Sequence, residues 1–455
     1  MRDQQHAISQ LLAERIASVD GAGLTPSLRE VCERLLIDVI GLCVVARRSD
    51  YVTAALTAWP EPGSATAIGH AACKSAAGAA FVNGTAAHGE DFDDTFEGGP
   101  VHAGAVIVPA VLAAAEADGL DGEAVLRGVA VGAETICRLS LVVPKAVHKA
   151  GFHPTAVFGA MAAAAAVGAA LKLDAGRLAS ALGIAGSMAG GIIEYLADGS
   201  WTKRMHPGWA AQSGLRAAHL ARAGFIGPAS VFEGVHGLFN GFARTRDGNW
   251  GALLDGFATR WHTADLAFKP YPCGTMIQPY VDCARRLHQR GLAADSIAEI
   301  VCEVGEGTVH RLWEPLAAKQ TPANGYAGKF AAPYCIAFAL VHGGLELGAF
   351  ADGKRMDPRV RALAEKVSYR IDPANPYPAA YTGHIQARLV DGRSIEERQA
   401  HMRGGAREPL SRAELEEKFL GNARLGGWSE AQARRALELS ARLWQAPRVE
   451  LGALR

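Results

Sequence analysis

The strongest constraint on this chain is a short polar run placed between two apolar, Ala- and Gly-rich segments. Residues 76–90 and 103–117 have the composition of helices that pack closely. Polar groups as dense as those between them are costly to bury unless each one has a partner or a ligand. The pattern therefore predicts a functional site held by two buried helices. Its polar residues are His88, Asp91, Asp93, Asp94, Thr95 and His102.

The geometry of this run depends on where the first helix ends. Residues three or four apart share one face of a helix. If helical geometry persists beyond residue 90, His88, Asp91 and Thr95 lie on one side, whereas Asp93 points elsewhere. The Gly98-Gly99-Pro100 break then turns the chain and returns the following residues toward the same place. A solvated acidic helix end is the alternative interpretation.

Length and charge exclude several classes of function. A chain of 455 residues is long enough for two or three domains. Lys and Arg total 46, as do Asp and Glu, which argues against a nucleic-acid surface or a polybasic membrane patch. The first residues are charged throughout and unlike a signal peptide, and the longest apolar run, 156–171, is too short to span a bilayer. We expect a cytoplasmic protein without nucleic-acid or membrane partners.

The eight cysteines are scattered along the chain, and no two of them form a CxxC pair. This spacing favours neither a zinc knuckle nor an iron–sulfur cluster. Because most of these residues lie in apolar contexts, we expect buried free thiols.

Helical patterns dominate the first part of the chain. Thr25 and Pro26 suit the N-cap and the first position of a helix, and another apolar helix is expected over residues 122–141. His153 precedes Pro154 in the same way. An imidazole at the positive end of a helix dipole has a lowered pKa and stays neutral, so it can act as a base. A capping histidine with no other task is the alternative.

A second polar segment, residues 198–208, reads DGSWTKRMHPG. We expect it to form a loop before a helix that begins near Trp209. The adjacent cations Lys203 and Arg204 suit a carboxylate or phosphate ligand, and His206 follows closely. An ordinary surface loop is the alternative.

The pattern changes after residues 268–274, where two prolines fix an extended segment with Lys269 near its start. We take this segment as a domain boundary. The expected fold is mainly α, with a large all-helical domain formed by residues 1–267 and 405–455. A smaller α+β lid domain, residues 268–404, is inserted before the C-terminal helices.

Residues beyond the boundary mix two kinds of periodicity. Alternating patterns predict strands, and one of them contains the hairpin signal Asp391-Gly392. Ser411 and Ser429 each begin a capping-box pattern, which predicts two C-terminal helices. Strands are expected over 297–307, 366–372 and 384–395, and helices over 330–344 and 358–367.

Six motifs occur in the order in which they occur in the MmgE/PrpD family, and the chain resembles that family from about residue 20 to 445. This family includes 2-methylcitrate dehydratase, cis-aconitate decarboxylase and iminodisuccinate epimerase. Membership implies a helical domain with an α+β lid, a homodimer, and no required metal or other cofactor. The motifs are NGTAAHGEDFDDT (83–95) with the later His102, GFHPTAVFG (151–159), DGSWTKRMHPG (198–208), GFIGP…EG (224–234), KPYPCG (269–274) and VDGRSI…PLSRAELEEKF (390–419).

The resemblance also implies a set of pocket residues. Two departures from the cis-aconitate decarboxylase pattern bear on the reaction. That pocket has a histidine where this chain has Gly274, and its His-Pro pair appears here as His102-Ala103 with a shift of one residue. Both departures weaken the case for decarboxylation and leave dehydration and epimerisation open. The implied pocket residues are Asp91, Thr95, His102, His153, Lys203 and Lys269.

The reactions of the family share one chemical problem, which is to stabilise the charge that forms next to a carboxylate. Removal of a proton there builds negative charge on the carboxylate oxygens, and fixed cations such as Lys203 stabilise it best when water is excluded. We expect His102 and His153 to be the acid/base pair, with Asp91 orienting one of them. The expected substrate-binding residues are Thr95, Lys269, Arg204 and His206, and no metal site is assigned.

The preferred hypothesis is a cofactor-free lyase that dehydrates a hydroxy di- or tricarboxylic acid such as 2-methylcitrate. Epimerisation by proton exchange next to a carboxylate and cis-aconitate-type decarboxylation are alternatives. A non-catalytic binding protein, suggested by Gly274, is another. A metal-dependent hydrolase is a further alternative, although the sequence contains no compact signature such as HExxH. The metal ligands would be His88, Asp91, Asp94, His102 and His153.

Overall fold

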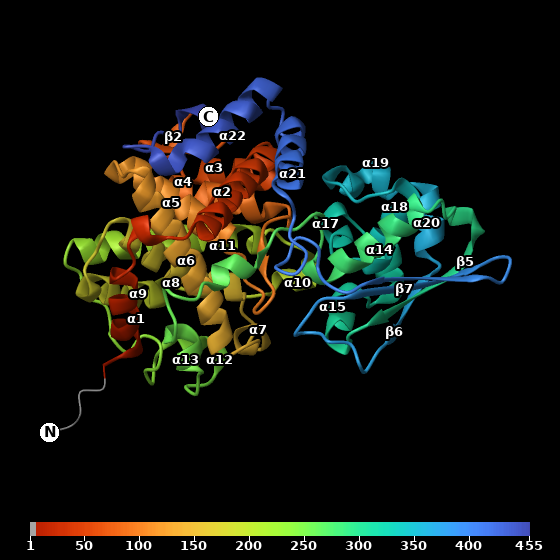
Figure 1. Cartoon of the computed structure of the whole chain (residues 1–455), viewed down its shortest axis with the longest axis horizontal. Coiled ribbons are helices and arrows are strands. Elements are labelled where there is room, and N and C mark those ends of the chain that lie inside the picture. The colour runs from red at the N-terminus through yellow and green to blue at the C-terminus, as the bar shows by residue number, and fades with distance from the viewer. Residues whose placement is uncertain (1–5) are drawn as a thin grey trace. The chain divides into compact units, whose positions relative to one another are not determined.

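The computed structural model describes residues 6–455, and the chain divides into two compact units. The first unit comprises Met1–Leu266 and Ser411–Arg455, and the second comprises Ala267–Leu410. The fold is mainly α, as predicted, and the longest strands belong to the second unit (Figure 1). Among residues 6–455, no helix combines the length and the apolar character that a membrane span requires.

The first unit is built around helices that are apolar on every side. Such helices suit a fully buried position, and every residue of α8 (Pro154–Ala170) is buried. The other helices are α1 (Ile8–Ala17), α2 (Pro26–Ala46), α3 (Asp50–Ala58), α4 (Ala76–Gly89), α5 (Gly104–Asp118), α6 (Gly122–Val142), α7 (Ala146–Lys149), α9 (Ala175–Met188), α10 (Tyr195–Asp198), α11 (Thr202–Arg222), α12 (Leu238–Ala243), α13 (Trp250–Leu254), α21 (Arg412–Leu425) and α22 (Glu430–Arg442).

Small residues allow the central helices to approach one another closely. Helix α11 packs against both α4 and α8. A Cβ atom added at Gly208 of α11 would lie 2.1 Å from the carbonyl oxygen of Phe81 in α4. One added at Gly84 would lie 2.6 Å from the Cα of Gly208. This crossing fixes the first turns of α11 beside α4, which ends in the polar run.

Many elements of the first unit were predicted correctly. The helices expected over 76–90, 103–117 and 122–141 are α4, α5 and α6. The Thr25 hydroxyl accepts a hydrogen bond from the backbone N–H of Leu28 at the start of α2. Both capping boxes are present, at Ser411 and Ser429. Helix α21, in blue in Figure 1, packs against α2, in red, so distant parts of the sequence share one core.

Two segments differ from the sequence prediction. Helix α4 ends at Gly89 and Asp91 adopts a left-handed backbone (φ +53°), so the polar run does not continue one helical face. The residues predicted to form a loop up to Trp209 instead enter α11, which begins at Thr202 and contains Pro207. Packing of α11 on its neighbours outweighs the weak helix propensity of this polar, proline-containing stretch.

The second unit contains a four-stranded sheet. Its strand order is β6-β5-β7-β8, with β5 parallel to β6 and antiparallel to β7. The hairpin predicted at Asp391-Gly392 connects β7 to β8, and α14 packs against both of these strands. The elements are β5 (Ile297–Val304), β6 (Val367–Ile371), β7 (Gly383–Leu389), β8 (Ser394–Gln399), α14 (Gln278–Gln289), α15 (Val309–Leu312), α16 (Leu316–Gln320), α17 (Gly325–Gly328), α18 (Ala332–His342), α19 (Asp352–Arg355) and α20 (Pro358–Ala364).

The strands and helices predicted in this region are therefore present.

All eight cysteines have free thiols, as expected. Cys73 is half-buried and the other seven are buried.

The contact between α4 and α11 gives a test of the packing. We expect Gly208→Ala to lower the free energy of unfolding by about 3 kcal/mol, because the new methyl group meets backbone atoms that cannot move aside. Gly421→Ala in α21 is the matched control, since a Cβ there has no neighbour within 4 Å and raises helix propensity by up to about 1 kcal/mol. Denaturant titration measures both, and equal stability of the two variants would contradict this account.

Candidate active site

Three histidines from separate segments meet in the interior of the first unit. His88 lies in the last turn of α4, His102 precedes α5, and His153 is the N-cap residue of α8. All three are buried. One ring nitrogen from each lies within 4.8 Å of the others. The structure thus brings together His102 and His153 and adds His88 to them.

Oxygen acceptors orient two of these rings. The Nδ1–H of His102 donates to the backbone carbonyl of Asp94 at 2.7 Å, and the Nδ1–H of His88 donates to the Asp93 carboxylate at 2.7 Å. Because these oxygens accept, the proton of each neutral ring is on Nδ1 and the lone pair is on Nε2. The Nε2 atom of His88 is buried and has no hydrogen-bond partner in the part of the chain that the structure describes.

Asp94 also fixes the start of α5. Its carboxylate accepts the backbone N–H groups of residues 103 and 104 at 2.9 and 2.8 Å. Burial, followed by the carboxylates of Asp93 and Asp38, raises the pKa of Asp94 to about 8, while the backbone donors act in the opposite direction. The backbone N–H of His102 donates to the Thr155 hydroxyl at 3.2 Å, which ties it to α8. His102 is therefore held through both its backbone and its ring.

His153 contacts a fourth imidazole. Its Nδ1 lies 3.2 Å from Nδ1 of His206 in α11, and its side chain does not cap α8. Burial first, and then the charges of His206, His88, Lys203 and His102, lower the pKa of His153 well below its ordinary value. Burial, His88 and Lys203 lower the pKa of His206 to about 4. Both rings are thus neutral near pH 7.

Lys203 and Asp91 form a close ion pair, and both side chains are buried. Asp91 was expected to orient a histidine. The structure pairs it with Lys203, and the carboxylate beside the rings of His88 and His102 is that of Asp93. Its Oδ2 is 2.7 Å from Nδ1 of His88 and 3.6 Å from Nδ1 of His102. The reason is the end of α4 at Gly89 and the left-handed turn at Asp91, which replace the assumed helical geometry.

The remaining predicted residues occupy different surroundings. Thr95 is buried in the short strand β3 (Thr95–Phe96). The Arg204 guanidinium lies 4.4 Å from the centre of the Tyr51 ring, whose hydroxyl donates to Glu90 at 2.9 Å. Arg204 is therefore directed toward Tyr51. Lys269 is buried and belongs to the second unit, and its part in the site stays a prediction.

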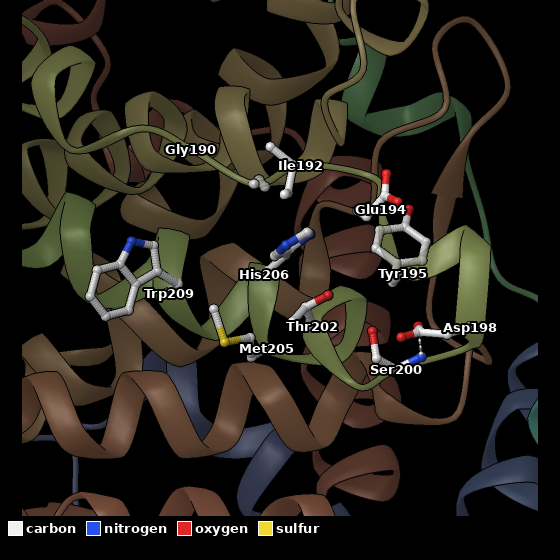
Figure 2. A pocket seen from close by; sticks show the side chains of 12 residues that line it. Gly190, Ile192, Glu194, Tyr195, Asp198, Ser200, Thr202, Met205, His206 and Trp209 are labelled. Atoms are coloured by element: carbon white, nitrogen blue, oxygen red, sulfur yellow. Dashed lines mark hydrogen bonds between the residues drawn. The ribbon is translucent and has the colours of Figure 1, made fainter.

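A pocket of ≈ 390 Å³ lies beside His206. Figure 2 shows the His206 ring with Trp209 on one side and Tyr195 on the other. The charged groups of its lining are the carboxylates of Glu194 and Asp198. The pocket leads to His206, which contacts His153, and its acidic rim does not favour an anion.

The ligand set of the metal-dependent alternative is gathered only in part. Within residues 6–455, the group whose spacing suits a metal ion is the three-histidine cluster. Asp91 is paired with Lys203, and the Asp94 carboxylate accepts backbone N–H groups. The same ring nitrogens serve equally well as proton acceptors and donors.

Asp93 and His88 are site residues to which the sequence analysis gave no role in proton transfer. Both belong to the polar run, but the assumed helix directed Asp93 away from the site. The sequence analysis did not place the end of the helix at Gly89. Because the helix ends there, the acidic residues that follow do not obey helical spacing. Asp93 then reaches back to His88, five residues earlier in the chain.

Comparison with known proteins adds an independent finding. Residues 10–251 match the MmgE/PrpD N-terminal domain, and residues 271–443 match the MmgE/PrpD C-terminal domain. The chain belongs to the MmgE/PrpD family. The resemblance found in its motifs is thus confirmed.

Related proteins of this family are enzymes. A cis-aconitate decarboxylase of Homo sapiens is 31% identical over 360 residues, which cover 76% of this chain and 72% of the human protein. A cis-aconitate decarboxylase of Aspergillus terreus is 27% identical over 425 residues, covering 86% of this chain and 84% of the fungal protein. This MmgE/PrpD protein is accordingly an enzyme of a lyase family.

The low pKa of His206 predicts how acid affects stability. Its folded value of about 4 lies below the ordinary value of 6.5, so acid protonates the unfolded state first. We expect the free energy of unfolding to fall as pH decreases from about 6.5 toward 4, by at most about 1.4 kcal/mol per pH unit for this group. Denaturant titrations at several pH values should show a shallower decrease for His206→Gln than for the wild type. Parallel curves would contradict this assignment.

Proposed function

We propose that this MmgE/PrpD protein is a cofactor-independent lyase that eliminates water from a small hydroxy di- or tricarboxylic acid such as 2-methylcitrate. The observation that supports it is a buried cluster of oriented imidazoles close to a buried lysine. The imidazoles of such a cluster can take a proton from the substrate and return one to it, and the lysine stabilises negative charge on a substrate carboxylate. The partner is a small acid, and the homodimer and cytoplasmic location implied earlier stay predictions.

His102 is the proposed base. Its Nδ1–H is engaged by the Asp94 carbonyl, so Nε2 carries the lone pair that takes a proton from the carbon next to a substrate carboxylate. The positive charge that then forms on the ring lies near the Asp93 carboxylate, 3.6 Å from Nδ1. An opposite charge at this distance favours the protonated ring.

His153 is the proposed acid. Its low pKa in the free protein makes the ring a strong acid once it is protonated. A polycarboxylate bound beside it raises that pKa, because a negative charge favours the imidazolium form. The protonated ring then gives its proton to the departing hydroxyl, which leaves as water. Substrate binding thereby prepares the acid, and His206 supports the ring through the contact between their Nδ1 atoms.

Lys203 is the proposed anion-stabilising group. It is buried, and a cation in a site without water stabilises developing negative charge more strongly than one in solvent. Because the pocket rim carries Glu194 and Asp198, we place the substrate carboxylates against Lys203 and not at that rim. Thr95 and Arg204 complete the proposed substrate-binding set within the first unit, and the part of Lys269 in substrate binding stays a prediction.

Decarboxylation of cis-aconitate is the second candidate, because the proteins with that name are 31% and 27% identical to this chain. Against it, the family pocket has a histidine where this chain has Gly274. A Cβ atom at that position would meet Phe330 and Leu312 at 3.4 and 3.5 Å, so its surroundings within the second unit are apolar. This observation weakens the case for decarboxylation and leaves epimerisation open beside dehydration.

A panel of hydroxy and unsaturated polycarboxylic acids tests the reaction. We expect 240 nm absorbance from a new double bond with a hydroxy acid. Lys203→Met should lower kcat/KM at least 100-fold because the charge loses its stabilising cation. Lys149→Met, at an exposed lysine of α7, is the control and should retain activity. Release of CO₂ from cis-aconitate would support the second candidate, and deuterium wash-in without net product would indicate epimerisation.

Chelation tests the assignment of proton transfer to the protein's own groups. We expect full activity after dialysis against a strong chelator, because imidazoles and Lys203 supply the acid, the base and the cation. Metal content and initial rate should be measured on the same sample. Loss of activity that returns on addition of one metal ion would instead favour the metal-dependent alternative.

A further inference from the structure

The proposed elimination leaves the site in the wrong protonation state for the next turnover. The C–H bond breaks and its proton goes to His102, the C–O bond breaks, and the hydroxyl leaves with a proton from His153. His102 is then protonated and His153 is not. Both are buried, with 7% and 5% of their surface exposed. A proton must therefore return from His102 to His153 in a place that solvent barely reaches.

His88 lies between these two residues. Its ring centre is 4.8 Å from that of His102 and 5.7 Å from that of His153, whereas the latter two rings are 6.4 Å apart. Its side chain is buried. The ring of His88 is therefore closer to each of these two rings than they are to each other.

The hydrogen bonds of His88 suit it to carry a proton. Its Nδ1–H donates to Asp93, and its Nε2 carries a buried lone pair that has no hydrogen-bond partner among residues 6–455. A proton taken at Nε2 creates an imidazolium beside the Asp93 carboxylate, which stabilises it. Ring nitrogens within 4.8 Å of one another are close enough for one water molecule to connect them through two hydrogen bonds of about 2.8 Å.

We propose that His88 is a proton relay, which takes the proton from His102 after each elimination and passes it to His153 while a polycarboxylate is still bound beside that ring. The proposal rests on the proposed function. One proton moves between neutral and protonated imidazoles, so neither net charge nor oxidation state changes. Asp93 balances the charge while the proton is on His88. His88 does not act on the substrate itself, so it is a positioning residue that serves the acid and the base.

Kinetics of His88→Asn separate a relay from a packing role. The Asn amide can still donate to Asp93 from a place near Nδ1, but nothing replaces Nε2. Because the proton returns after the elimination, we expect kcat to fall at least tenfold while kcat/KM stays within about threefold of the wild type. The kcat of the variant should rise with added imidazole at constant pH and ionic strength, since a diffusible base replaces the missing ring. The wild type should not respond.

Two further variants complete the experiment. His219→Asn is the matched control: this histidine of α11 pairs with Asp118 at 2.9 Å and should leave both constants unchanged. If His88→Asn does not fold, His88→Gln serves the same test, because an amide does not relay protons near neutral pH.

Each outcome is decisive. A parallel fall of kcat and kcat/KM without imidazole rescue would overturn the relay and leave the proposed function intact. A wild type inactive on every acid in the panel would overturn both.

Discussion

The close crossing of α4 and α11 is the contact on which the site depends. Gly84 and Gly208 let the two backbones approach, and no larger residue fits at that point. The first turns of α11 therefore lie over the polar run that follows α4. This places Lys203 against Asp91 and His206 against His153. The close packing of α4 and α11 at two glycines thus determines where the charged side chains of the site meet.

Burial of so many polar groups is possible because they compensate one another in pairs. Asp91 has Lys203, Asp93 has the imidazole of His88, and Asp94 has backbone N–H groups. An uncompensated charge in the same place would cost several kcal/mol. The pair of Asp93 and His88 also fixes which nitrogen of the His88 ring carries the proton. The hydrogen bonds that make burial of these groups possible therefore also orient a ring of the candidate site.

The sequence predicts the elements of this fold better than the contacts between them. Apolar composition was sufficient for α4, α5 and α8, and alternation was sufficient for β5 and β7, because both signals are local. The predicted start of α11 was seven residues too late. Its polar residues and Pro207 look like a loop in the sequence, but packing against neighbouring helices makes them helical in the fold. Propensity is a weak guide wherever tertiary contacts are this close.

The candidate site was predictable in its composition but not in its pairing. His102, His153 and Lys203 follow from residue type and motif. The contacts of Asp91 with Lys203 and of Asp93 with His88 depend on the left-handed backbone at Asp91, which no periodicity reveals. His88 was named in the polar run, but its role was not predicted, because that role depends on a contact with Asp93, five positions later in the chain. Backbone breaks are where pattern-based assignment of a site fails first.

Asp94 carries a consequence for how this enzyme can change over time. Its side chain begins α5 and its carbonyl sets the tautomer of His102. A replacement of the side chain disturbs a long core helix before any change in chemistry can be selected. The proposed base, His102, is thereby shielded from gradual alteration, and we expect new substrates to be acquired by changes at residues farther from it.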